Sequence, residues 1–314
     1  MAVHGPPPAL SLIESSLSAA ARGNPRVALV TCRELPDLDP DDRLLLEPLR
    51  AHGFTVDGVA WDDPTADWAG YDLAVLRSTW DYPRRRDAFL HWTRTVPALA
   101  NPAAVVAWNT DKRYLADLAA AGVPVVLTVW LDPADPPWAP PAGGEYVIKP
   151  AVGAGSVDTG RYDLGAAGHR ELAERHAARL QAAGRTVLIQ PYLPAVDTYG
   201  ETALLFLGGR FSHAIRKGPL LDGPDEGVAG LYRPEEITPR EPTAEERALA
   251  EKALTAAPFG TDLLYARVDM IPGPHGAPRL IELELTEPSL FLGYAPGAAD
   301  RLAGAIADRL SAAG

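Results

Sequence analysis

Apolar runs and helical patterns alternate along the first third of the chain. Residues 26–32 form an almost continuous apolar run, which predicts a buried strand, and the shorter runs at residues 54–56 and 73–76 between turn-forming residues predict two further strands. A charged stretch after the first run has four leucines at helical spacing between residues 44 and 49. This alternation predicts a small α/β lobe that ends near residue 105.

The middle of the chain predicts a helix followed by a second set of strands. Asn109 or Thr110 can cap a helix with apolar residues on one side from Tyr114 to Ala119, and Gly122 can end it. Strands are expected at residues 125–130, 146–149 and 187–190, and a further helix at residues 171–183.

The last third predicts two strand pairs and two helices. Gly208-Gly209 separates apolar runs at residues 203–207 and 210–215, which is a hairpin signal. A second strand pair is expected at residues 265–271 and 279–285 around a Gly/Pro turn. Thr243 and Glu246 form a capping box for a helix at residues 243–257, and a closing helix is expected at residues 298–312.

Composition limits the classes of protein that the chain can belong to. Its 314 residues are 47% hydrophobic, which is enough for more than one core and for two or three lobes. The net charge of −12 argues against non-specific nucleic-acid binding, although a few lysines in a cleft can still bind phosphate. Cys32 is the single cysteine, so the chain can form neither an internal disulfide nor a thiolate zinc site of its own, and a reducing cytoplasm fits.

Membrane and export signals are not expected. No apolar run approaches the roughly 20 residues that span a bilayer. Residues 1–22 lack a basic segment leading into a long apolar one, so we expect a frayed or helical extension there instead of a signal peptide.

Acidic side chains concentrate on the last predicted strand pair. Strand alternation places Glu282 and Glu284 on one face, with Ile281, Leu283 and Leu285 on the other. Arg267 and Asp269 share a face of the preceding strand. If the two strands pair, three carboxylates and one guanidinium face the same cavity. Packed carboxylates need a divalent cation or raised pKa values, and hard oxygen ligands suit magnesium; the alternative is a charged sheet face in water.

A lysine precedes a glycine-rich segment in the middle of the chain. Lys149 ends an apolar strand, and Gly153-Ala-Gly155-Ser156 follows it. Glycines allow backbone N–H groups to approach phosphate oxygens, so this segment is a candidate polyphosphate site, although a plain surface turn has the same pattern. Lys112 is a second candidate cation, with a solvated surface lysine as the alternative.

A possible hinge follows the next strand. Gln190, Tyr192 and Leu193 could offer backbone groups to an adenine edge, with Asp197 or Glu201 on the ribose hydroxyls. The same segment could equally be an ordinary interdomain loop. No nucleophile is evident, because the G-x-S-x-G and H-E-x-x-H motifs are absent and Cys32 has no assignable His partner. His213 is expected to be structural or a substrate contact.

The order of these motifs resembles the ATP-grasp superfamily, in its glutathione-synthetase-like branch, over residues 26 to 310. The motifs run from Lys112 through Lys149-Pro, Gly153-x-Gly155, Gln190-x-Tyr192-Leu193 and Arg267-x-Asp269 to Glu282-x-Glu284. Within that branch, four stretches are most similar to the cyclo-ligases of cycloserine biosynthesis, which close O-ureido-serine into a ring. They are Arg77-Ser-Thr-Trp80, Asp111 to Leu118, His213 to Gly218 and Glu284 to Leu290.

The resemblance implies an α/β (α+β) ATP-grasp fold. It would have an N-terminal extension at residues 1–24 and a Rossmann-like pre-ATP-grasp lobe at 25–105. Two α+β lobes would sandwich ATP: a small lid subdomain at 106–190 and a C-terminal catalytic subdomain at 191–314.

The resemblance also implies roles for individual residues. Lys112 and Lys149 would hold the ATP phosphates under a lid at Gly153, Gly155 and Ser156. Gln190, Tyr192 and Leu193 would line the adenine pocket, and Asp197 or Glu201 would bind ribose. Asp269, Glu282 and Glu284 would hold magnesium, with two ions expected, and Arg267 and Lys217 would face the transferring phosphoryl group. Arg77, Ser78, Trp80, Glu287 and Ser289 are candidate substrate contacts, with simple packing as the alternative for Trp80.

The implied activity is that of an ATP- and magnesium-dependent ligase. It would activate a small-molecule carboxylate as an acyl phosphate for attack by a nitrogen nucleophile. An ATP-grasp kinase and a non-catalytic nucleotide-binding regulator are the alternatives, and a homodimer is one option for its assembly. The chain departs from the family in having Glu284 where Asn is usual, and Ser156 where a further Gly is usual.

Overall fold

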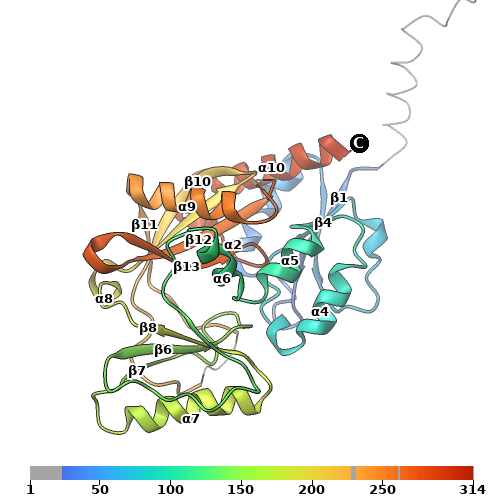
Figure 1. The fold of residues 1–314 in the computed structure, drawn as a ribbon. Coiled ribbons are helices and arrows are strands. Elements are labelled where there is room, and N and C mark those ends of the chain that lie inside the picture. Colours follow the sequence, from blue (N-terminus) through green and yellow to red (C-terminus); the bar gives the residue numbers. More distant parts are fainter. Residues whose placement is uncertain (1–22, 228–230, 261, 314) are drawn as a thin grey trace, which may run out of the picture.

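The computed structural model describes residues 23–227, 231–260 and 262–313, and these residues form three sheets with their helices (Figure 1). The expected extension at residues 1–22 lies outside the described residues. No helix in the described part of the chain combines the length and apolarity that a membrane crossing needs.

The first sheet is parallel and has the strand order β2-β1-β3-β4. The three predicted apolar runs form β1 (Arg26–Thr31), β2 (Thr55–Ala60) and β3 (Leu73–Leu76), and a short β4 (Leu99–Ala100) that was not predicted completes the sheet. The connecting helices are α2 (Pro40–Arg43), α3 (Leu46–Ala51) and α4 (Arg86–Thr93). The predicted α/β lobe is therefore confirmed, although the leucine-rich stretch forms two short helices.

The second sheet is antiparallel and has the order β5-β8-β6-β7. It contains β5 (Val129–Leu131), β6 (Glu145–Pro150), β7 (Gly160–Asp163) and β8 (Val187–Pro191), and α7 (His169–Ala182) covers one face. In Figure 1 this sheet and α7 make the lower lobe. Lys149 lies on β6 and the glycine-rich segment links β6 to β7, so the lobe carries both candidate phosphate contacts.

The third sheet is antiparallel and has the order β11-β10-β9-β12-β13. Its strands are β9 (Glu201–Leu207), β10 (Arg210–Lys217), β11 (Ile237–Arg240), β12 (Tyr265–Pro272) and β13 (Pro278–Glu284). Both predicted hairpins, β9-β10 and β12-β13, are present. A short helix, α8 (Val196–Tyr199), connects the second sheet to this one.

Helices pack on both sides of the third sheet and join it to the first. α10 (Ala298–Ala313) shares one core with β1, β9 and α3, which ties the two sheets together. α5 (Ala103–Asn109), α6 (Tyr114–Ala120) and α9 (Ala244–Ala256) share the other core with β12 and β13. The predicted capping box of Thr243 and Glu246 begins α9. The strand pair β12-β13 is thus held rigidly from behind.

The prediction of one strand over residues 125–130 is wrong. Val125 pairs with Leu280 at the edge of the third sheet, and only Val129 to Leu131 belong to the second sheet. The apolar run is divided because the chain crosses from one lobe to the other within it.

The predicted cap of the helix before this run is also wrong. α6 begins at Tyr114, and no side chain caps it. The Asn109 amide instead donates to Leu283 O at 2.7 Å and accepts from Leu285 N at 2.7 Å. Asn109 therefore fixes the position of β13 from outside the third sheet.

The predicted alternation on β13 fails at one residue. A β-bulge shifts the register between Asp269 and Met270, so Ile281 is left without a partner on β12. Leu280 and Leu283 both enter the core, while Ile281 turns to the opposite side and faces a cavity. The bulge adds one apolar side chain to the face that carries Glu282 and Glu284.

Candidate active site

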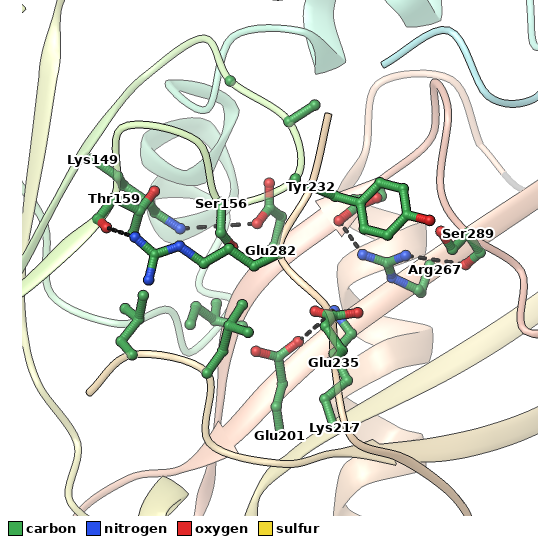
Figure 2. Close-up of a pocket in the computed structure, with 18 of the residues that line it drawn as sticks. Lys149, Ser156, Thr159, Glu201, Lys217, Tyr232, Glu235, Arg267, Glu282 and Ser289 are labelled. Carbon is green, nitrogen blue, oxygen red and sulfur yellow. Dashed lines mark hydrogen bonds and ion pairs between the residues drawn. The ribbon is translucent and has the colours of Figure 1, made fainter. Parts of the chain in front are cut away.

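A cavity of about 400 Å³ lies between the second and third sheets, and segments of the first lobe line part of it. Most residues singled out in the sequence line it: Trp80, Lys112, Lys149, Gly153, Gly155, Ser156, Gln190, Tyr192, Leu193, Glu201, Lys217, Arg267, Glu282, Glu284, Glu287 and Ser289. Figure 2 shows Lys149 and Glu282 on one side of the cavity and Arg267, Tyr232 and Ser289 on the other. Asp269, Asp197, Arg77 and Ser78 lie elsewhere.

Glu282 on β13 pairs with two lysines that come from earlier segments of the chain. Lys112 Nζ lies 2.7 Å from Glu282 Oε1, and Lys149 Nζ lies 3.8 Å from Oε2. Burial raises the pKa of Glu282, but the two lysines outweigh it and leave the pKa below its ordinary value. Burial lowers the pKa of Lys149 by more than Glu282 raises it. Both lysines are buried cations. An anion that entered the cavity could replace Glu282 as their ion-pair partner.

Asp269 lies behind the cavity wall and joins two further cations. The two strands pair as expected, and their register places Arg267 opposite Glu284 and Asp269 opposite Glu282. Arg267 Nε donates to Asp269 Oδ1 at 2.9 Å, and Lys217 Nζ lies 2.9 Å from Asp269 Oδ2. Burial raises the pKa of Asp269, but Arg267 and Lys217 lower it to about 2, so this carboxylate stays ionised.

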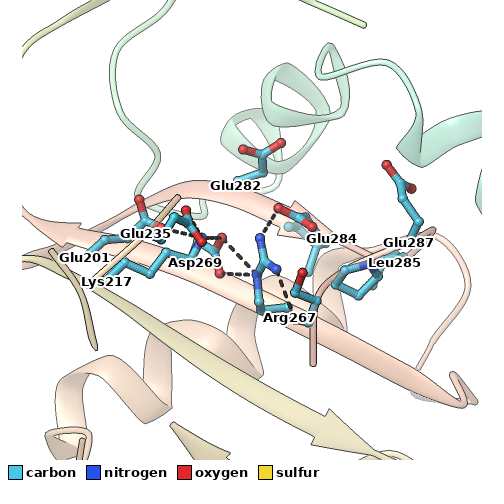
Figure 3. A network of polar contacts seen from close by, with 12 residues as sticks. Glu201, Lys217, Glu235, Arg267, Asp269, Glu282, Glu284, Leu285 and Glu287 are labelled. Carbon is cyan, nitrogen blue, oxygen red and sulfur yellow. Dashed lines mark hydrogen bonds and ion pairs between the residues drawn. The ribbon is translucent and has the colours of Figure 1, made fainter. Parts of the chain in front are cut away.

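Two acidic side chains on the cavity wall have strongly raised pKa values. Glu284 bonds to Arg267, but burial and the neighbouring Glu282 and Asp269 raise the pKa of Glu284 to about 7. Burial and Glu284 raise the pKa of Glu287 to about 8. Figure 3 shows Glu282, Glu284 and Glu287 following one another along this wall. Crowded carboxylates have raised pKa values where too few cations compensate them.

The carboxylates present fit a magnesium ion only if phosphate oxygens of a nucleotide complete its coordination shell. Within the described ranges, no group of three or more Asp, Glu, His or Cys side chains is already gathered for a metal ion. Magnesium in phosphate sites takes one or two carboxylates and completes its shell with phosphate oxygens and waters. Glu282 and Glu284 supply such hard oxygen donors on one cavity face.

The two candidate ribose-binding acids have different surroundings. Asp197 accepts bonds from Arg161 at 3.1 Å and from the Tyr192 hydroxyl at 2.5 Å, outside the cavity lining. Glu201 lines the cavity, where Lys217 Nζ lies 2.8 Å from its Oε1. Burial raises the pKa of Glu201 to about 7 even beside Lys217.

Arg77 and Ser78 do not reach the cavity. Arg77 is buried, lies 2.8 Å from Asp42 Oδ1 and donates to Pro288 O at 2.7 Å. Ser78 is buried against the Thr31 hydroxyl at 3.0 Å. Ser78 therefore packs within the first lobe, and Arg77 joins that lobe to the segment after β13.

The hinge end of the cavity is apolar. Val147 of β6, Leu193 after β8, and Ile271 and Ile281 of the third sheet line it beside Gln190. Gln190 Nε2 donates to Thr128 Oγ1 at 3.0 Å. The isoleucines were not predicted, because strand alternation assigns Ile281 to the core.

The glycine-rich segment packs against a loop from the third sheet. Arg233 N donates to Gly155 O at 3.2 Å. A Cβ on Gly155 would lie 2.7 Å from Tyr232 Cα, and its φ of +61° is one that glycine adopts readily. The loop before β11 also supplies Tyr232 and Glu235 to the cavity. Sequence patterns missed this loop, because its residues lack any regular period.

Comparison with known proteins identifies the fold. The ATP-grasp ligase PsnB, in a structure complexed with a minimal precursor, Mg and ADP, aligns with a TM-score of 0.55 at 20% identity, covering 91% of this chain and 98% of that one. The crystal structure of D-cycloserine synthetase DcsG aligns with a TM-score of 0.81 at 39% identity, covering 91% of this chain and 99% of that one. The chain therefore has the ATP-grasp fold.

The sequence comparisons give the family. A family model described as the N-terminal domain of D-cycloserine synthetase DcsG matches residues 27–105. The cycloserine biosynthesis protein DcsG of Streptomyces lavendulae is 40% identical over 299 residues, covering 90% of this chain and 98% of that protein. The chain belongs to the DcsG family, and it is an ATP-dependent ligase. The expected resemblance and fold class are confirmed.

Proposed function

We propose that this protein uses ATP and magnesium to convert the carboxylate of a small amino-acid derivative into an acyl phosphate, which a nitrogen nucleophile then attacks. The observation that carries the proposal is the pairing of Lys112 and Lys149 with Glu282 across one cavity. Two cations that could bind phosphate lie there beside a carboxylate that could bind magnesium, and the three residues come from two lobes.

The nucleotide would lie across the cavity from the hinge to Glu282. Its adenine would fill the apolar end beside Gln190, Tyr192 and Leu193, and its phosphates would bind Lys112 and Lys149. Of the two acids that the sequence offers for ribose, Glu201 is supported by its place in the cavity lining, since Asp197 is bound to Arg161 and Tyr192.

Magnesium would be held by Glu282 and Glu284, together with phosphate oxygens and waters. When bound, it neutralises the phosphate charge that builds up during transfer. Asp269 could join only after Arg267 or Lys217 leaves it, and we propose that both cations turn toward the transferring phosphoryl group. The presence of a third carboxylate fits the expected second ion.

The chemistry proceeds in two steps. An oxygen of the substrate carboxylate attacks the γ-phosphorus of ATP, and the bond to the β–γ bridging oxygen breaks to release ADP. The nitrogen nucleophile then attacks the acyl carbon, loses its proton and expels phosphate. Lys149, Arg267 and Lys217 stabilise charge without a covalent enzyme intermediate. Gly153, Gly155 and Ser156 would exclude water, which otherwise hydrolyses the acyl phosphate.

The proposed lobes are residues 25–105, 106–190 and 191–314. The first sheet lies within the first range, the second sheet spans residues 129–191 and the third spans residues 201–284. The nucleotide would then bind between the last two lobes, as the resemblance to ATP-grasp enzymes implies.

O-ureido-serine is the proposed substrate class, with ring closure as the second step. The support is the 40% identity to cycloserine biosynthesis protein DcsG over almost the full length of both chains. The test is an ADP-release assay over O-ureido-serine, other amino acids and hydroxylamine derivatives, with mass spectrometry of the products. A cyclic or amide product supports the proposal.

The same assay separates the rival functions. A stable phosphorylated product without a new carbon–nitrogen bond would indicate an ATP-grasp kinase. Absence of substrate-stimulated ADP release across the panel would favour a nucleotide-binding regulator.

A further inference from the structure

The end of the cavity near Arg267 contains a carboxylate without a cationic partner. Each of four other cavity glutamates, Glu201, Glu235, Glu282 and Glu284, forms an ion pair with a lysine or arginine. The cavity aspartates, Asp39 and Asp41, accept backbone N–H groups. Among the ion pairs formed within the described ranges, none includes Glu287. This wall of the cavity therefore has an acidic group that a positively charged ligand could neutralise.

Aromatic side chains surround that carboxylate. Trp80 Nε1 donates to the backbone oxygen of Glu287 at 3.0 Å, which fixes the indole ring beside it. Tyr232 packs edge-to-face on Trp80 with ring centroids 5.1 Å apart. The buried Tyr82 hydroxyl is close enough to Glu287 to stabilise its ionised form. Aromatic faces attract ammonium groups, and this attraction adds to that of a carboxylate.

Arg267 is fixed to the same segment. Its guanidinium donates to Ser289 O at 3.0 Å, two residues beyond Glu287. Figure 2 shows Tyr232 and Ser289 beside Arg267. A cation suited to a carboxylate and an acidic group that a bound ammonium group would keep ionised thus lie on one short stretch of wall. A small molecule that carries both groups could contact both residues.

We propose that Glu287, with Trp80, Tyr82 and Tyr232, binds the free ammonium group of an amino-acid substrate whose carboxylate lies at Arg267. This inference rests on the proposed function and narrows its substrate class to small zwitterions. Acids without an amino group, and N-acylated amino acids, would leave Glu287 unpaired in the closed cavity, which is costly.

The test compares amino acids with their des-amino counterparts. ADP release is measured with O-ureido-serine and 3-(ureidooxy)propanoate, serine and 3-hydroxypropanoate, and alanine and propanoate, using both enantiomers of each amino acid. The active pair should favour its amino member by about tenfold or more, as expected for a hydrogen bond to a charged group. This comparison uses the wild-type protein, so it does not depend on any variant folding.

A variant then tests whether Glu287 causes the preference for the amino acid over its des-amino counterpart. Glu287→Gln should raise KM for the amino member by about tenfold and remove most of the preference, with KM for ATP unchanged. Glu251→Gln, which changes an exposed helix residue, is the matched control and should keep the preference.

Two results would overturn the inference and leave the proposed function in place. One is equal ADP release from both members of the active pair. The other is a Glu287→Gln variant that lowers kcat equally on both members without changing KM, since that would indicate a role in chemistry instead of recognition. No ADP release with any pair would overturn the proposed function and this subsite with it.

Discussion

Lys112 Nζ and Glu282 Oε1 lie 2.7 Å apart, although the two residues are far apart in the sequence. Lys112 precedes α6, whereas Glu282 lies on β13. Lys112 Nζ also donates to Gly153 O at 2.9 Å, so the same ammonium contacts the glycine-rich segment. The ion pair therefore joins a proposed phosphate ligand, a proposed magnesium ligand and the lid. Each would have to exchange partners when nucleotide and metal bind.

Glu282→Gln should reduce turnover by at least about a hundredfold while leaving the fold intact, because it would remove one of the two proposed anionic magnesium ligands. The measurement is kcat from ADP release across a magnesium titration. Glu251→Gln, on the exposed side of α9, is the control and should behave as wild type. Activity close to wild type in Glu282→Gln would refute the metal role.

Gly155→Ala should uncouple ADP release from product formation. The added methyl group would meet Leu231 O and Tyr232 Cα, so the lid and the loop before β11 could no longer pack closely. Water would then reach the acyl phosphate. Measuring ADP and ligated product together should show about a tenfold fall in product per ADP, because the altered lid would exclude water poorly. Gly143→Ala, which meets no atom within 4 Å, is the control, and equal coupling in both variants would contradict the lid role.

Asp42→Ala should destabilise the protein by about 3 to 5 kcal/mol, because it leaves the buried Arg77 guanidinium without its carboxylate. Urea unfolding gives the change in the free energy of unfolding. Asp262→Ala breaks a surface pair with Arg309 at 2.8 Å and should cost about 1 kcal/mol or less. If Asp42→Ala costs no more than this control, the structural role assigned to Arg77 is wrong.

The nucleotide-free protein should lose stability as pH rises from about 4.5 to about 8. Glu287 has a pKa of about 8 in the folded chain against 4.5 ordinarily, so the folded state binds its proton more tightly within that window. The free energy of unfolding must then fall as pH rises, and it levels off above the folded pKa. The Glu287 contribution should be on the order of 1 to 3 kcal/mol. Urea unfolding at pH 5.5 and 8.5 should show a smaller difference for Glu287→Gln than for wild type; equal differences would count against this pKa.

Sequence patterns predicted most of the wall that carries the acidic residues. Two-residue alternation and a turn were enough to predict that the strands of Arg267 and Glu284 pair, because a hairpin is a local structure; the residue partners come from the structure. The bulge at Ile281 was not predictable, since it interrupts that period without a glycine or proline to mark it.

The hydrophobic and turn patterns of the sequence could not predict contacts between segments that are far apart in the chain. Arg77 looked like a substrate contact, but its partners Asp42 and Pro288 are far away in sequence. The aromatic pair of Trp80 and Tyr232 joins the first lobe to an irregular loop, so neither periodicity nor turn chemistry indicates it.

The most direct test is a crystal structure with a non-hydrolysable ATP analogue and manganese in place of magnesium, with the metal located by its anomalous scattering. We expect an anomalous peak within coordination distance of Glu282 and Glu284, and analogue phosphates at Lys112 and Lys149. A metal bound away from both glutamates, or a nucleotide outside the cavity between the second and third sheets, would contradict this expectation.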